Sequence, residues 1–244
     1  HIVYITPSGA GKKDGSSWDH ASPHLSFAVK RPYASPTQIW VKSGTYYGDT
    51  TLETAFQIAA NNKVYGGFAG NEPANFNINV RNFTQNTSIL DGQHKQRVVA
   101  TAGATDTNRS ICDGFILQNG YTETGGAGAF MNGGKLSNCI IRNNTNDSSY
   151  GGGVYVIGKA ILVNCNIYNN TAIFGGGAMI WDTTYLVNCN FVNNTVTSNG
   201  GGIYVGDTCF AVNCIFWGNK RNTYANQIAN SSNTLTDISF SAIQ

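Results

Sequence analysis

A repeat of roughly 25 residues fills the second half of the chain and constrains its fold more than any other feature. Four cysteines mark successive repeats, each 14 residues after a glycine: Cys139, Cys165, Cys189 and Cys214 follow Gly125, Gly151, Gly175 and Gly200. From each of these glycines to the next asparagine there are always 19 residues, whereas the return distance varies between 5 and 7. All length variation therefore falls in one loop per repeat, which is what a solenoid with a variable rim predicts.

The fixed part of each repeat has a period of two. Val154 and Val156 flank Tyr155, and similar alternation continues to Leu162, which indicates strands with one buried side. The alignment predicts two inward columns of apolar residues. They are Ile141, Ile167, Phe191 and Phe216, and Phe130, Val156, Ile180 and Val205. This pattern predicts an all-β, single-stranded parallel β-helix of about nine coils, each with about three strands.

A series of asparagines accompanies the repeat: Asn119, Asn144, Asn170, Asn194 and Asn219. Asparagine tolerates left-handed backbone geometry at a tight turn, and its amide can hydrogen-bond to the equivalent amide one coil away. The series therefore predicts a structural ladder. Cys139, Cys165, Cys189 and Cys214 are expected to fill small inward positions as free thiols, since parallel stacking is poor geometry for a disulfide. Cys112 and Cys209 stand outside the series, and the sequence does not assign their pairing.

The sequence divides one β-helix domain, 1–244, into four parts. Residues 1–38 hold an N-terminal strand and a capping helix, in which Ser22 is the expected N-cap, Pro23 begins the first turn, and Leu25, Ala28 and Val29 form the apolar face. Residues 39–118 form irregular coils, 119–220 form the regular Gly/Asn/Cys repeats, and 221–244 form the last coil. No C-terminal cover is visible, so we expect a further domain or chain beyond Gln244.

Composition argues against a nucleic-acid partner and against a membrane-spanning helix. The net charge is only +2, charged residues make up 11% of the chain, and the basic residues are scattered, so we expect no nucleic-acid partner. No apolar run approaches the roughly 18 residues that a membrane-spanning helix needs, so we expect no transmembrane segment.

The residues also resemble a known superfamily. The opening VYITPSGAGKKDGSSWDHA, the segment IWVKSGTYY, ILDG at 89–92 and DGFILQNG at 113–120 resemble bacterial secreted domains of the pectin-lyase-like superfamily, which are right-handed parallel β-helices. The repeats are similar to those of polymorphic outer-membrane proteins, with GGAM at 176–179 and FxxN at 191–194. The resemblance implies an extracellular or bacterial cell-surface location, associated with the outer membrane.

One acidic pair is a candidate catalytic or calcium site. Asp182 and Asp207 each follow an aligned glycine by seven residues, so we expect them to stack on neighbouring coils, about 5 Å apart. Paired carboxylates serve glycoside hydrolases, and several carboxylates bind Ca²⁺. The alternative is a pair of solvated turns, because WDTT and GDTC are typical Asx-turn sequences. No other cofactor is expected.

An outward column of large side chains is the second candidate site. Tyr155, Met179 and Tyr204 align on consecutive coils, with Trp181 close by. Flat apolar rings suit stacking against sugar rings, so these residues are the candidate ligand-binding residues for a polysaccharide or glycan. The alternative is that the aromatic residues only pack across strands.

Three functions remain open. The first is a non-catalytic surface module for adhesion or glycan binding. The second is a polysaccharide lyase or glycoside hydrolase that acts in a shallow groove. The third is a structural stalk that displays another part of a larger surface protein.

Overall fold

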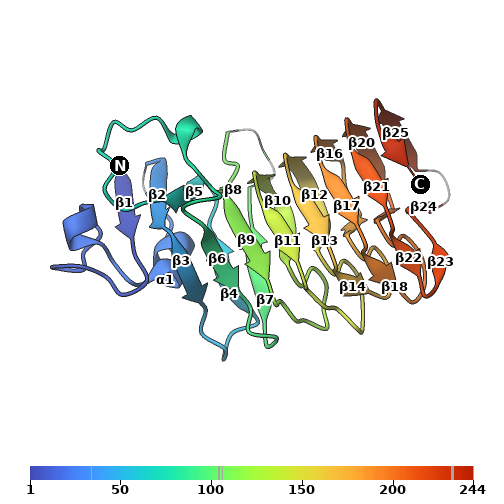
Figure 1. Ribbon diagram of the computed structural model, residues 1–244, viewed down its shortest axis with the longest axis horizontal. Helices are drawn as coiled ribbons and strands as arrows, with labels where there is room; N and C mark the ends of the chain where they lie inside the picture. The colour runs from blue at the N-terminus through green and yellow to red at the C-terminus, as the bar shows by residue number, and fades with distance from the viewer. Residues whose placement is uncertain (34, 104, 106, 232–233, 244) are drawn as a thin grey trace.

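The computed structural model describes residues 1–33, 35–103, 105, 107–231 and 234–243, and it shows a coil of short parallel strands. The coil advances from left to right in Figure 1, from the N-terminal segment to the last strands. Each regular turn visits three faces in the same order, and each strand pairs with its equivalents one turn away. The fold is an all-β parallel β-helix, as the repeat predicts.

The first and second faces belong to one 14-stranded sheet, because two long strands, β10 and β12, run around the corner between them. The first face contains β1 (Ile2–Ile5), β2 (Thr37–Lys42), β5 (Asn62–Phe68), β8 (Ile111–Asp113), the second halves of β10 (Ala129–Ser137) and β12 (Val154–Val163), β16 (Thr184–Val187), β20 (Thr208–Val212) and β25 (Leu235–Ser239). The second face contains β4 (Thr54–Ile58), β7 (Arg97–Thr101), the first halves of β10 and β12, β15 (Ala178–Ile180), β19 (Ile203–Val205) and β24 (Ile228–Asn230).

The third face is a separate 8-stranded sheet. It contains β3 (Gly44–Tyr47), β6 (Ser88–Asp91), β9 (Phe115–Gln118), β11 (Ile140–Arg142), β13 (Asn166–Tyr168), β17 (Asn190–Val192), β21 (Ile215–Trp217) and β26 (Ala242–Ile243). A small sheet follows it at one corner, with β14 (Thr171–Ala172), β18 (Thr195–Val196), β22 (Lys220–Arg221) and β23 (Tyr224–Ala225), of which β22 and β23 pair antiparallel. Since the third face has eight strands among the described residues, the coil makes about eight turns, one fewer than expected.

The predicted inward column on the third face is confirmed. Strand pairing places its four members in register, and all are fully buried; they are Ile141, Ile167, Phe191 and Phe216. The rings of Phe191 and Phe216 stack with centroids 5.1 Å apart. Like side chains thus pack on like along the axis, which is how a solenoid fills its core.

The second predicted inward column is wrong at its first member. Phe130 pairs with Tyr155 and points outward, whereas Met131 pairs with Val156 and is fully buried. The cause is a β-bulge at the corner, where the pairing of β10 with β12 passes over Ile157. Counting back from the aligned cysteines therefore misplaces the first repeat by one residue.

The asparagine ladder is confirmed for Asn144, Asn170, Asn194 and Asn219. Nδ2 of Asn170 donates to Oδ1 of Asn194 and to the carbonyl of Ile141, both at 3.0 Å. Oδ1 of Asn194 also accepts the backbone N–H of Asn170, so each amide connects successive turns in both directions. All four ladder side chains are fully buried, and their amides would be costly to leave unpaired.

Asn119, the fifth predicted member, is not part of the ladder. Gly120 occupies that position and donates its N–H to Oδ1 of Asn144 at 2.8 Å. Asn119 has a φ of 55° and donates instead to Asp91, at 2.8 Å. The same division holds one repeat later, where Asn169 has a φ of 54° and Asn170 belongs to the ladder. In each turn, therefore, one residue adopts the left-handed geometry and the next one forms the amide ladder.

A second row of asparagines turns the chain between the first and third faces. Its members precede the repeat cysteines and have φ between 51° and 54°; they are Asn138, Asn164, Asn188 and Asn213. Their exposed amides connect turns, with Nδ2 of Asn213 donating to Oδ1 of Asn188 at 2.8 Å. Each repeat thus contains two asparagine-rich turns, which explains the Asn–Cys pairs of the sequence.

All six cysteines are free and buried. The predicted free thiols at Cys139, Cys165, Cys189 and Cys214 are confirmed. Cys112 lies on β8 beside Leu136, and Cys209 lies on β20 beside Thr184, so both are core residues without a disulfide.

The N-terminal cover is a short helix, α1 (Leu25–Lys30), and two 3-10 turns lie elsewhere in the N-terminal half, η1 (Trp18–His20) and η2 (Ile78–Val80). Leu25, Ala28 and Val29 are buried against the core as predicted. The carbonyl of Val29 accepts the N–H of Ala59 at 3.0 Å, so the helix covers the end of the second face next to β4. The predicted cap is wrong. The helix begins two residues later than Pro23, because Ser22 bridges to Ile5 and its Oγ accepts the N–H of His24.

No helix among the described residues has the length and apolarity to cross a bilayer. Gln244, after which we expect a further domain or chain, lies outside the described residues.

Candidate functional site

The outer surface of the second face carries one continuous column of side chains. Strand pairing places its members in the order Gln57, Ala100, Phe130, Tyr155, Met179 and Tyr204. Three of the four candidate ligand-binding residues thus stack in the predicted register. The column extends two turns further toward the N-terminus than the regular repeats, so a ligand on it could contact irregular and regular coils together.

Met179 is not exposed as expected, since only 1% of its surface is accessible. Two residues from the variable loops, Tyr150 and Phe174, lie against the neighbouring rings of the column. Tyr150 stacks on Tyr155 with centroids 6.0 Å apart, and Phe174 meets Tyr204 edge-on at 5.6 Å. The two loop rings are themselves 5.7 Å apart, so the surface over Met179 is aromatic.

Trp181 completes the exposed part of this surface. It follows β15 and is 41% exposed, with its ring 6.4 Å from the rings of both Tyr150 and Tyr204. Its six-membered ring lies against Gly206, where any Cβ would come within 2.2 Å of the indole. We define the aromatic cluster as Phe130, Tyr150, Tyr155, Phe174, Trp181 and Tyr204. It presents a half-exposed surface without a charged side chain of its own.

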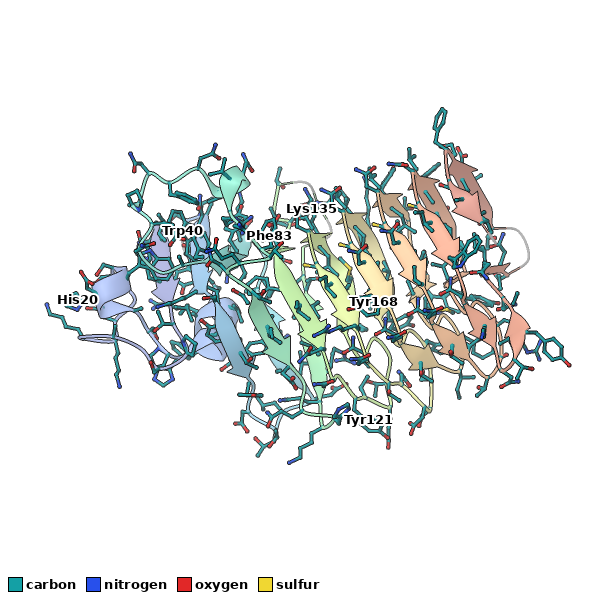
Figure 2. The ribbon with its side chains drawn as sticks, viewed as in Figure 1. His20, Trp40, Phe83, Tyr121, Lys135 and Tyr168 are labelled. Atoms are coloured by element: carbon teal, nitrogen blue, oxygen red, sulfur yellow. The ribbon has the colours of Figure 1, made fainter. Side chains whose placement is uncertain are left out.

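A groove of about 560 Å³ adjoins the aromatic cluster at its N-terminal side. Phe130 belongs to both, since it lines the groove and its ring lies 5.7 Å from that of Tyr155. The far wall comes from α1 and from the loop before β4, where Phe27 is 69% and Leu52 is 48% exposed. The groove therefore continues the same column and offers further apolar surface to a ligand. Tyr168, labelled in Figure 2, lies on the third face and is not part of this surface.

The floor of the groove holds a buried cation, Arg97. Its Nη2 donates to Oγ1 of Thr124 at 2.8 Å and forms an ion pair with Glu53 at 3.1 Å. Its Nε and Nη1 donate to the carbonyl of Gly125 and to Oγ1 of Thr54. The guanidinium also lies 4.9 Å from the centre of the Phe130 ring. Arg97 thus ties β4, β7 and the loop before β10 together.

Glu53 is exposed but held in place. Oγ1 of Thr124 donates to its Oε1 at 2.6 Å. This hydrogen bond, together with the charge of Arg97, lowers the pKa of Glu53 below its usual value. Burial lowers the pKa of Arg97, and the negative charge of Glu53 opposes this effect. At neutral pH both groups are therefore charged, and they neutralise each other.

Asp182 and Asp207 lie two residues after the ends of β15 and β19, in the turns that lead to the first face. Oδ1 of Asp182 accepts the N–H of Thr183 at 2.5 Å, and Oδ1 of Asp207 accepts the hydroxyl of Thr208 at 3.1 Å. Each carboxylate thus binds the residue that follows it, within its own turn. Within the described ranges, no group of three or more His, Cys, Asp or Glu side chains could hold a metal ion. Since Ca²⁺ takes six to eight oxygen ligands, an ion at Asp182 and Asp207 would need most of its ligands from backbone carbonyls and water.

Periodicity alone did not identify several residues of this surface. Tyr150 and Phe174 come from the loops of variable length, and Phe27 and Arg97 come from the irregular part of the chain. One signal was present: TNDSSY and TAIF both end in an aromatic residue directly before the repeat glycine.

No family model and no curated protein matches the sequence. The crystal structure of pectate lyase Pel9A is similar to this chain with 13% sequence identity and a TM-score of 0.34, over 98% of this chain and 76% of that one. A likeness at this TM-score supports no argument about the site. The assignment as a parallel β-helix follows from the strand pairing described above.

Proposed function

We propose that this chain is a non-catalytic module that binds polysaccharide along its second face. The observation that carries the proposal is the aromatic cluster, whose rings are half-exposed and continue into the groove through Phe130. Aromatic rings bind sugars through their apolar faces, and single rings scattered over a surface would not form a continuous platform. The groove supplies polar groups beside the rings, such as Gln57 and Asn132, which can orient hydroxyl groups.

The two charged residues Arg97 and Glu53 in the groove are consistent with a role in binding. Arg97 and Glu53 form an ion pair, and their other contacts hold β4, β7 and the following loop in place. An ion pair held in this way fixes the shape of the groove. A general acid would need a carboxyl group with a raised pKa, whereas the pKa of Glu53 is lowered. We place the protein outside the cell or at a bacterial cell surface, on the basis of the resemblance of its sequence to secreted β-helix domains.

A panel of immobilised plant and microbial polysaccharides tests the proposal. We expect the wild-type protein to bind at least one of them, and we expect Trp181→Ala to weaken that binding about fivefold or more, because one stacked ring contributes on the order of 1 kcal/mol or more. Trp217→Ala is the matched control. Trp217 is 53% exposed but lies on the third face, so its removal should leave binding unchanged.

Three outcomes would contradict the proposal. They are no retention by any polysaccharide, equal loss in both tryptophan variants, and the appearance of shortened sugar products during incubation. The last outcome would favour the lyase or hydrolase alternative.

A further inference from the structure

Resting on the proposed function, we propose that the ligand is an uncharged polysaccharide chain that lies parallel to the axis of the coil. The inference has two parts, the charge of the ligand and its direction. The charge of the ligand is inferred from the charged residues that line the groove and border the aromatic cluster. The direction of the ligand is inferred from the register of the outward column.

The buried cation of the groove cannot bind an acidic sugar. The Nε, Nη1 and Nη2 atoms of Arg97 all donate to protein acceptors, among them Glu53, Thr54 and Gly125. A sugar carboxylate would have to displace Glu53, which Thr124 also holds. Arg97 is only 6% exposed, so an anionic ligand could not approach its guanidinium without opening the wall of the groove.

Carboxylates occur at both ends of this surface. Asp49 and Glu53 line the groove, and both are exposed carboxylates whose pKa values are lowered by hydrogen bonds. Asp182 and Asp207 follow the strands that carry Met179 and Tyr204. Lys30, an exposed cation, also lines the groove. Arg97 neutralises Glu53, and Lys30 balances the charge of Asp49, so the groove has no net positive charge to attract a polyuronate. Asp182 and Asp207 add negative charge beside the aromatic cluster, so this surface favours a neutral chain.

The direction follows from the register. From Gln57 to Tyr204 the column takes five steps between paired strands. At about 4.8 Å a step, this spans about 24 Å along the axis. The groove forms one end of that line and the aromatic cluster the other, joined at Phe130. A long oligosaccharide laid along the column would contact most of both, whereas a disaccharide could cover only a part of the column.

Two lysines lie beyond the corner, on the first face. Lys159 belongs to β12 after the bulge, and its Nζ lies 5.9 Å from the ring centre of Tyr185 on the first face. Lys135 pairs with Ile161 on the same face and is labelled in the upper half of the molecule in Figure 2. Neither residue lines the groove.

Titration with defined oligosaccharides tests the inference. The probes are cellohexaose, xylohexaose and mannohexaose as neutral chains, their disaccharides, and hexagalacturonate as the acidic chain, each measured calorimetrically at low and high sodium chloride. We expect a neutral hexasaccharide to bind with a Kd that changes less than about twofold with salt, because no charge is screened. We expect its disaccharide to bind about tenfold or more weakly, since the smaller ligand reaches only one half of the column.

The possible failures are distinguishable. Preferential binding of hexagalacturonate that weakens with salt would overturn the uncharged ligand but leave polysaccharide binding standing. Equal affinity for disaccharide and hexasaccharide would overturn the axial direction. If neither these probes nor any polysaccharide of the immobilised panel binds, both this inference and the proposed function fail. Trp217→Ala again serves as the control for surface aromatics on another face.

Discussion

Gln227 ends the asparagine ladder by hydrogen-bonding to Asn219 in both directions. Its Oε1 accepts from Nδ2 and N of Asn219 at 2.7 and 3.2 Å, and its Nε2 donates to the Asn219 carbonyl at 3.2 Å. Gln227 occupies the place that Gly202 holds one turn earlier, because its carbonyl accepts the N–H of Ile203 just as that of Gly202 accepts the N–H of Ala178. A Cβ at Gly202 would come within 3.0 Å of the Asn219 amide. A glutamine at this place therefore supplies the acceptor for both N–H groups of Asn219.

We predict that Gln227→Ala destabilises the C-terminal turns. The substitution leaves the backbone N–H and side-chain amide of Asn219 without their acceptor in a buried place, which costs about 1–3 kcal/mol. Hydrogen exchange should show faster exchange of the Asn219 N–H, with little change near β2. Asn230→Ala, an exposed change on the same turn, is the control. Unaltered exchange at Asn219 would show that Gln227 does not support the ladder.

Asn170→Ala should lower the free energy of unfolding by at least about 1–3 kcal/mol. Asn170 is fully buried in the middle of the ladder, and its Oδ1 accepts both the N–H and the Nδ2 of Asn144. Urea unfolding followed by circular dichroism measures the loss. The neighbouring Asn169→Gly is the matched control, because Asn169 is exposed at a φ of 54° and glycine adopts that geometry freely. The control should stay within about 1 kcal/mol of wild type. Equal losses in the two variants would mean that the ladder adds nothing specific.

The sequence predicted the fold because the repeat and the strand period agree with each other. The spacing of cysteines, glycines and asparagines gives the length of one turn of the coil. The alternation of apolar and polar residues shows which side chains face inward. The errors at Asn119 and Phe130 are each a shift of one residue. Gln118 pairs with Arg142, so Asn119 corresponds to Asn143 rather than to Asn144. The cause at Phe130 is a bulge. The bulge that passes over Ile157 gives β12 one residue more than β10, and equal spacing in the sequence hides a change of register in space.

The candidate site could be predicted only in part. Tyr155, Met179 and Tyr204 follow from the repeat, since strand pairing carries one residue per turn to the same surface. The burial of Met179 could not be predicted, because Tyr150 and Phe174 reach the surface from loops that have no fixed length. The groove depends on contacts between irregular segments far apart in the chain, such as Arg97 with Glu53 and Thr124, which no local pattern encodes.

Glu53 should make stability depend on acid pH. Its folded-state pKa lies below the usual 4.5, chiefly because of the hydrogen bond from Thr124. Its stabilising contribution is therefore complete above pH 4.5 and is lost as the pH falls through the folded-state pKa. We expect Tm to fall less steeply below pH 4.5 in Glu53→Gln than in the wild type. Glu123→Gln, at an exposed glutamate nearby, should keep the wild-type profile. Parallel curves for wild type and Glu53→Gln would contradict the role of this carboxylate.

The cysteines should not react with thiol reagents in the folded protein. Burial raises the pKa of Cys209 to about 12, and the thiolate is the form that attacks a disulfide reagent. Cys139, Cys165, Cys189 and Cys214 are also buried free thiols, each fixed in a stack that leaves no path for a reagent. With Ellman's reagent at pH 8 we expect no fast release of thionitrobenzoate from the native protein and six equivalents after unfolding in guanidinium, one for each cysteine. Because the reagent reports only thiols that become accessible, the rate of slow release measures opening of the coil, and Asn170→Ala should increase it. Prompt labelling of any native thiol would mean that a turn of the coil opens far more readily than its packing implies.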